Sequence, residues 1–210
     1  LQSKMYTISS AYSELSKSRS EYVQFYMKNH EQIPTWIMIK VVNFSTFIDV
    51  LHNSKTNVTH AICKLYSMYD DNNLPNVKLL IGSLHWLRRV RNSCAHNERV
   101  YCIHQTQARN NSASGRILDP YYTQLPTSYS RCTEKNIFDI LVYFKYFLPT
   151  EEFTPMIIEL KNMLIELQNT LQTNAFDNVR GQMGIKNLNV LDALIALPKS
   201  KIEYHKFDTL

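Results

Sequence analysis

The stretch of sequence that decides the fold is Leu84-His85-Trp86-Leu87-Arg88-Arg89-Val90-Arg91-Asn92-Ser93-Cys94-Ala95-His96-Asn97-Glu98-Arg99-Val100-Tyr101. Its upstream half has the apolar period of an amphipathic helix, which we expect to run from about Asn76 toward Arg99. Apolar side chains at helical spacing predict the core face of this helix, namely Val77, Leu80, Leu84, Leu87 and Cys94. Arg91 falls in the same arc, where an arginine needs a partner or a groove.

Beside this arc lies a polar stripe formed by Arg88, Asn92, His96 and Arg99. Arg91 and His96 are therefore about 140° apart on an ideal helix. They can meet at one phosphate if the helix bends or if Arg91 reaches around it. The third route is a two-fold dimer that sets the helix against its copy.

The residue types in this helix suit the cleavage of RNA. An arginine can neutralise a phosphate, and a histidine can move a proton near neutral pH. The candidate catalytic residues are therefore Arg91, Asn92 and His96. The purely structural alternative makes Arg91 the ion-pair partner of Glu98.

Two other chemistries are weaker interpretations of the same stretch. Cys94 and His96 are two residues apart and face away from each other on a helix, so they do not form a thiol–imidazole dyad. A zinc site from Cys94, His96, Cys102 and His104 lacks the usual ligand spacing. No metal or other cofactor is therefore expected.

The run Arg91-Asn92-x-x-Ala95-His96-x-x-Arg99 resembles the core of the bacterial abortive-infection proteins of the Abi-like (AbiD/AbiF) family. Residues 34–45 are similar to the proline-x-tryptophan helix of that family, with Ser45 in place of a glycine. Met183-Gly184-Ile185 is similar in part to its C-terminal segment. The resemblance covers roughly residues 22–197.

The resemblance implies membership of the HEPN superfamily, and hence an all-α helical bundle of about six to seven helices. It also implies a metal-independent endoribonuclease that defends a bacterium during phage infection. In such an enzyme a ribose 2′-hydroxyl attacks the adjacent phosphate, so DNA is not a substrate. His96 would transfer the proton, Arg91 would stabilise the charge and Asn92 would orient the imidazole or the phosphate. A homodimer through the motif helix is implied as well.

Candidate RNA-binding residues flank the motif and continue into a long loop, residues 102–132. They are Arg88, Arg89, Arg99, Tyr101, Arg116 and Arg131. Tyr121, Tyr122 and Tyr129 could stack on single-stranded RNA beside the loop arginines. Equally, these aromatic side chains could only fix the loop to the bundle.

Bulk properties agree with a helical, globular protein. The 210 residues predict one domain, 44% of them are hydrophobic, and there are four glycines. A net charge of +5 permits RNA as a partner without requiring it. No apolar run is long enough for a membrane span and no signal peptide opens the chain, so we expect a cytoplasmic protein with free cysteines. Because Leu1 is not methionine, we expect the natural N-terminus to lie further upstream.

Periodicity and capping residues predict the remaining helices over residues 9–28, 34–51, 57–69, 133–148, 150–171 and 190–197. Pro34 should begin the second of these, and its dense apolar content predicts burial at the centre of the fold. Thr133 is the expected cap of the helix that follows the long loop. Asn174 to Gly184 is rich in turn residues and is expected to be irregular.

Two other functions are open on the sequence. The first is a non-catalytic RNA-binding module, in which loss of His96 would matter little. The second is a subunit of a toxin–antitoxin pair, which an exposed apolar patch away from Arg91 would favour.

Overall fold

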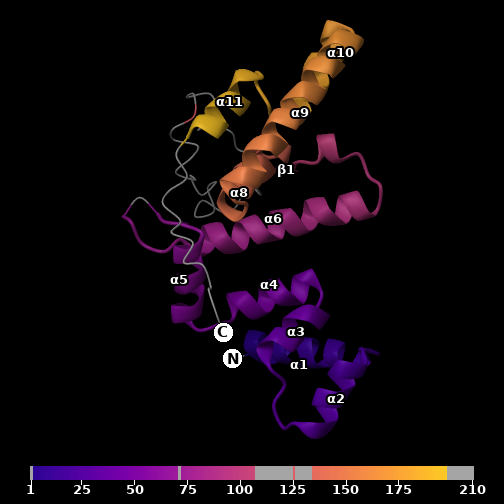
Figure 1. The fold of residues 1–210 in the computed structure, drawn as a ribbon, viewed down its shortest axis with the longest axis vertical. Coiled ribbons are helices and arrows are strands. Elements are labelled where there is room, and N and C mark those ends of the chain that lie inside the picture. The colour runs from indigo at the N-terminus through magenta and orange to yellow at the C-terminus, as the bar shows by residue number, and fades with distance from the viewer. Residues whose placement is uncertain (1, 71, 107–124, 126–133, 198–210) are drawn as a thin grey trace. The chain divides into compact units, whose positions relative to one another are not determined.

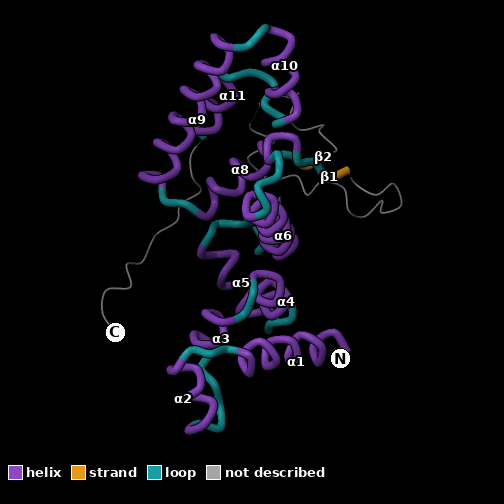
Figure 2. The backbone as a smooth tube through the Cα atoms, turned by 90° about the vertical axis from the view of Figure 1, so that its right-hand side faces the viewer, coloured by secondary structure: helices purple, strands orange, loops and turns teal. Residues whose placement is uncertain are grey.

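The structure is a computed structural model that describes residues 2–70, 72–106, 125 and 134–197. The protein is all-α, as expected (Figures 1 and 2). The described residues contain ten α-helices, a 3₁₀ turn and one pair of two-residue strands. Ten exceeds the expected six to seven because two of the expected helices are each divided and a segment expected to be irregular is helical.

The backbone forms two compact units, residues 1–59 and residues 60–210. The division falls within α5 (Thr56–Leu65). Each unit is described by itself below, and the single domain expected over residues 1–210 stays a prediction.

The first unit contains α1 (Gln2–Lys17), α2 (Glu21–Asn29), α3 (Thr35–Val41) and α4 (Phe44–His52). Its core includes the fully buried side chains of Leu15, Val23 and Ile37. Two interruptions divide the helices expected over residues 9–28 and 34–51. Ser20 is the N-cap residue of α2, and the Asn43 side chain accepts a hydrogen bond from the Thr46 amide to cap α4. Both residue types favour helix starts over helix interiors.

Glu14 joins α1 to the start of α4. One oxygen of its carboxylate accepts a hydrogen bond from the Asn43 amide, and the other accepts from Asn43 Nδ2 at 2.6 Å and from the Thr46 hydroxyl. A negative charge at a helix N-terminus is favourable because the backbone N–H groups there lack partners. Glu14 therefore fixes the packing of α1 against α4.

We expect Glu14→Ala to lower the free energy of local unfolding of α4 by about 1–2 kcal/mol, because three donors lose a charged acceptor. Amide hydrogen exchange of α4 measures this change. Glu31→Ala is the matched control, since Glu31 is exposed and lies between helices. Equal protection of α4 in the two variants would contradict the role given to Glu14.

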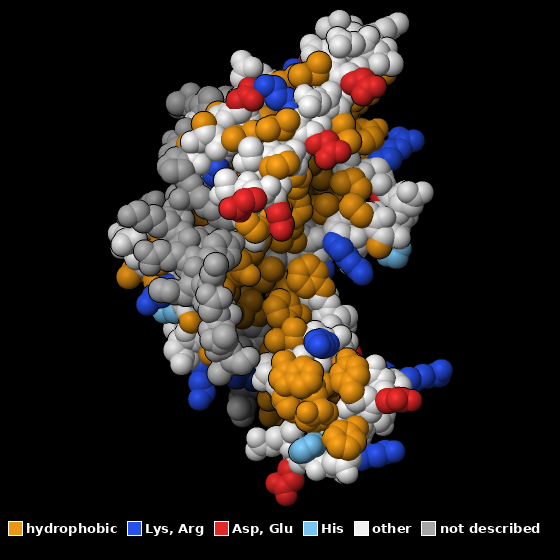
Figure 3. Space-filling view, in the orientation of Figure 1, with side chains coloured by type: hydrophobic (Ala, Val, Ile, Leu, Met, Phe, Trp, Pro, Cys, Tyr) orange, Lys and Arg blue, Asp and Glu red, His pale blue; other side chains and the backbone are white. Residues whose placement is uncertain are grey.

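The first half of the segment expected at the centre of the fold, α3, is largely exposed. Trp36 on α3 is 51% exposed, and Ile37 is the only residue of α3 that is buried. Trp36 packs edge-on against Tyr26, with ring centroids 6.0 Å apart, and Lys40 Nζ lies 5.2 Å from its ring. Figure 3 shows hydrophobic side chains gathered on the surface over α2 and α3. The expectation of burial is therefore wrong for α3, which is short and buries one face only, whereas α4 buries Thr46, Ile48 and Leu51.

The second unit contains α6 (Val77–Ala95), the 3₁₀ turn η1 (Val100–Cys102), α8 (Ile137–Phe147), α9 (Thr150–Thr170), α10 (Thr173–Gln182) and α11 (Asn189–Ala196). Helices α9 and α11 agree with the expected ranges. Asn136 caps α8, because its side chain accepts a hydrogen bond from the Phe138 amide. Thr133, the expected cap, lies outside the described residues. Among the described residues, no helix combines the length and apolarity that a membrane span requires.

Helix α10 replaces the irregular connection expected at residues 174–184. Arg180 stabilises it by contacting Asp177 at 2.8 Å and the carbonyl of Ile185 at 3.0 Å. The turn-forming residue at the end of this segment is Gly184, with a φ of 77°. A Cβ at Gly184 would collide with the Asn136 side chain, so glycine is required where this segment meets the start of α8.

Candidate functional site

The motif helix α6 begins at an asparagine cap and buries one continuous face. The Asn76 side chain accepts a hydrogen bond from the Leu79 amide at 3.0 Å. Buried residues at spacings of three and four follow along the helix, namely Leu79, Ser83, Trp86, Val90 and Ser93, with Leu80, Ile81 and Leu84 beside them.

The buried face is rotated relative to the expected one. Leu87 is only half-buried and Cys94 is exposed, whereas Trp86 is 2% exposed. Arg91 therefore lies on the exposed surface and not in the core arc. Its guanidinium donates a hydrogen bond from Nη1 to Asn92 Oδ1 at 3.1 Å, and no ion pair joins it to Glu98 in the described chain.

The helix ends in a Schellman motif that places His96 at the C-cap. Asn97 has a φ of 56°, in the left-handed region that asparagine tolerates. Its amide donates to the carbonyl of Cys94 at 3.1 Å, and the Glu98 amide donates to the carbonyl of Ser93 at 2.9 Å. The helix thus ends before Arg99, which does not continue the polar stripe as expected.

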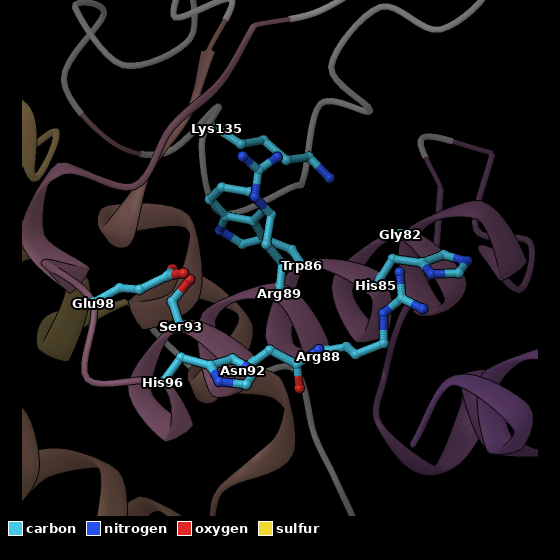
Figure 4. A pocket seen from close by; sticks show the side chains of 10 residues that line it. All are labelled: Gly82, His85, Trp86, Arg88, Arg89, Asn92, Ser93, His96, Glu98 and Lys135. Atoms are coloured by element: carbon cyan, nitrogen blue, oxygen red, sulfur yellow. The ribbon is translucent and has the colours of Figure 1, made fainter. Parts of the chain in front are cut away.

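A cleft of about 570 Å³ follows the polar side of α6 (Figure 4). The residues that line it are Gly82, His85, Trp86, Arg88, Arg89, Asn92, Ser93, His96, Glu98 and Lys135. The cleft thus brings imidazole, amide, guanidinium and ammonium groups to one surface. Such groups can bind a phosphate and transfer protons.

The cleft contains four of the expected site residues, Arg88, Arg89, Asn92 and His96. Arg91, Arg99 and Tyr101 are described but do not line it. Arg91 approaches the cleft only through its hydrogen bond to Asn92. The loop residues Arg116 and Arg131, together with Tyr121, Tyr122 and Tyr129, lie outside the described residues.

Sequence reasoning missed His85 and Lys135. His85 precedes Arg88 by three residues, so helical spacing alone could have added it to the polar stripe. Lys135 reaches the cleft because β1 (Gln105–Thr106) pairs with β2 (Glu134–Lys135) in antiparallel fashion, with Gln105 opposite Lys135. A pair of two-residue strands leaves no pattern in the sequence that could predict this contact.

Trp86 anchors the floor of the cleft. Its Nε1 donates a hydrogen bond to the carbonyl of Asn136 at 3.0 Å, which ties α6 to the start of α8. The guanidinium of Arg89 lies 5.5 Å from the centre of the Trp86 ring, a cation–π distance. Trp86 therefore positions both a cationic side chain and the segment that carries Lys135.

The alternative chemistries find no support in the geometry. Where the chain is described, no three His, Cys, Asp or Glu side chains gather as potential metal ligands. Cys63 is buried, and burial raises the pKa of its thiol to about 11, so it is not a candidate nucleophile.

The motif helix and nine of the ten residues that line its cleft lie within a segment that matches a known protein family. Residues 2–102 match the family model described as Abi-like protein. Residues 2–102, just under half of the chain, are thus similar to the Abi-like family. This Abi-like segment ends before Met183, so the partial similarity at residues 183–185 lies outside it.

Neither the curated proteins nor the solved structures gave a match to the chain. Nine of the ten residues that line the cleft belong to the Abi-like segment, and the tenth is Lys135.

Proposed function

We propose that the protein is a metal-independent endoribonuclease of an abortive-infection system, with a HEPN-type site. The observation that carries the proposal is the cleft along α6, where His96 and Asn92 share one surface with Arg88 and Arg89. This surface supplies a proton-transfer group and cationic groups for a phosphate. The Abi-like family of residues 2–102 supports the biological setting.

The proposed reaction is an internal transesterification of RNA. The 2′-oxygen attacks the adjacent phosphorus, the bond from phosphorus to the 5′-oxygen breaks, and the products carry a 2′,3′-cyclic phosphate and a 5′-hydroxyl. His96 removes the 2′-hydroxyl proton or protonates the leaving 5′-oxygen. Arginine side chains stabilise the negative charge that grows on the equatorial oxygens.

Arg91 enters this reaction from the edge of the cleft. Its hydrogen bond to Asn92 Oδ1 places its guanidinium beside a residue that lines the cleft, and Asn92 then acts as a positioning residue. A two-fold dimer along α6 is part of the proposal, because it would bring the exposed Arg91 of one protomer to the cleft of its partner. RNA and a second copy of the chain are thus the proposed partners.

We expect the purified protein to cleave RNA at an unchanged rate in excess EDTA, because side chains perform every step of the proposed reaction. The measurement uses a labelled DNA oligonucleotide that contains a single ribonucleotide, beside an all-DNA strand of the same sequence. Cleavage should occur only after the ribonucleotide and should leave a 2′,3′-cyclic phosphate.

Cleavage of the all-DNA strand, or loss of RNA cleavage in EDTA, would contradict this mechanism. RNA that is bound but left intact under all conditions would instead support the non-catalytic RNA-binding module.

A further inference from the structure

Lys135 brings a positive charge into the cleft from outside the Abi-like segment. The strand pairing with β1 fixes its backbone. Its Nζ lies 5.7 Å from the ring centre of Tyr143 and 3.9 Å from the point that a Cβ on Gly82 would occupy. The ammonium group therefore lies over α6, near Gly82.

Gly82 stands in the interior of α6, where glycine is unfavourable by about 1 kcal/mol relative to alanine. Its missing side chain leaves space on the helix surface directly below Lys135. A long side chain at this position would fill that space. A residue of low helix propensity thus occupies the position of α6 that lies nearest to the Lys135 ammonium in the cleft.

The Lys135 ammonium and the Arg89 guanidinium lie in a different part of the cleft from His96, the proposed proton-transfer group. Figure 4 shows Lys135 and Arg89 on one side, with Asn92 and His96 on the other. From Gly82, near Lys135, to His96 the helix rises about 21 Å, which exceeds the spacing of neighbouring phosphates along a strand. Glu98, the one acidic residue among those that line the cleft, is near Ser93 and away from Lys135.

We propose that Lys135, which lies over Gly82 of α6, forms a second phosphate subsite that binds the RNA backbone at a nucleotide remote from the bond cleaved at His96. This inference rests on the proposed function and adds a substrate requirement to it. The preferred substrate is single-stranded RNA long enough to reach from His96 to Lys135. A dinucleotide, with its single phosphate, occupies only the His96 end.

The test compares Lys135→Gln with the wild-type protein in binding 2′-O-methyl RNA, which lacks the attacking hydroxyl and stays intact. Fluorescence anisotropy should show about tenfold weaker binding of a hexanucleotide. The slope of the logarithm of the binding constant against the logarithm of the salt concentration should fall in magnitude by about one. Binding of a dinucleotide should be unchanged. Lys78→Ala is the matched control, since Lys78 is exposed on α6 and does not line the cleft.

Thermal melting of Lys135→Gln checks that the variant folds. Unchanged hexanucleotide binding, or an equal loss on the dinucleotide, would overturn the subsite, and so would wild-type protein that binds no RNA. The binding test uses RNA that cannot be cleaved, so it does not depend on catalysis. A wild-type protein that leaves ordinary RNA intact would therefore contradict the proposed ribonuclease function but not the subsite. Length-dependent loss in Lys135→Gln would still establish the subsite.

Discussion

Replacing His96 by alanine is expected to lower the rate constant for RNA cleavage by about 10²–10⁴-fold, the usual contribution of a positioned acid or base. Single-turnover cleavage of the strand with one ribonucleotide measures this constant without interference from product release. Two imidazoles are among the described residues that line the cleft, and His96 lies at one end of it, apart from His85. Binding of 2′-O-methyl RNA should persist, because the cationic groups of the cleft remain.

His104→Ala is the matched control, since His104 is exposed, close in sequence and outside the cleft. It should cleave at the wild-type rate. A His96→Ala variant that cleaves as fast as this control would remove His96 from the reaction.

The His96→Ala variant also tests whether Arg91 acts across a dimer or within its own protomer. If the site is shared across a two-fold dimer, mixing inactive Arg91→Ala and His96→Ala proteins restores about a quarter of the wild-type activity, because half of the dimers carry one intact site of two. If Arg91 acts within its own protomer through Asn92, the mixture stays inactive.

Trp86→Ala is expected to lower the free energy of unfolding by about 3–5 kcal/mol, the range for large aromatic residues in a core. Trp86 is among the largest fully buried side chains of the protein, and its removal leaves a cavity between α6 and α8. It also leaves the Asn136 carbonyl without the indole donor. Urea unfolding followed by far-ultraviolet circular dichroism measures the loss.

Trp86→Phe is the matched control, because it removes the N–H donor while keeping most of the apolar volume. Its cost should be smaller, about 1–3 kcal/mol. A loss below about 1 kcal/mol in Trp86→Ala would mean that α6 and α8 repack without this anchor.

The sequence predicts well where local signals agree with tertiary packing. The motif helix, α9 and α11 have strong apolar periods and clear stops, and their ranges are close to those expected. The prediction of one helix over residues 34–51 is wrong, because the dense apolar residues indicate a continuous helix although the Asn43 cap begins a second one. Side-chain chemistry predicted the polar stripe, and three of its four residues, Arg88, Asn92 and His96, line the cleft.

Other features depend on contacts that no local pattern encodes. The indole of Trp86 finds the Asn136 carbonyl fifty residues later, and this contact rotates the core face away from Leu87 and Cys94. Lys135 reaches the site through backbone pairing with Gln105. The separation of Arg91 from His96 follows from helix geometry, whereas the hydrogen bond from Arg91 to Asn92 does not.

The left-handed backbone at Asn97 makes the proposed reaction sensitive to a residue that touches no RNA. Because His96 is the C-cap residue of α6, any fraying of the last turn displaces the imidazole directly. A β-branched residue at 97 would disfavour a φ of 56° and loosen that turn. Natural variation at this position would thus adjust catalytic rate through mechanical rigidity, while every group that contacts the substrate stays the same.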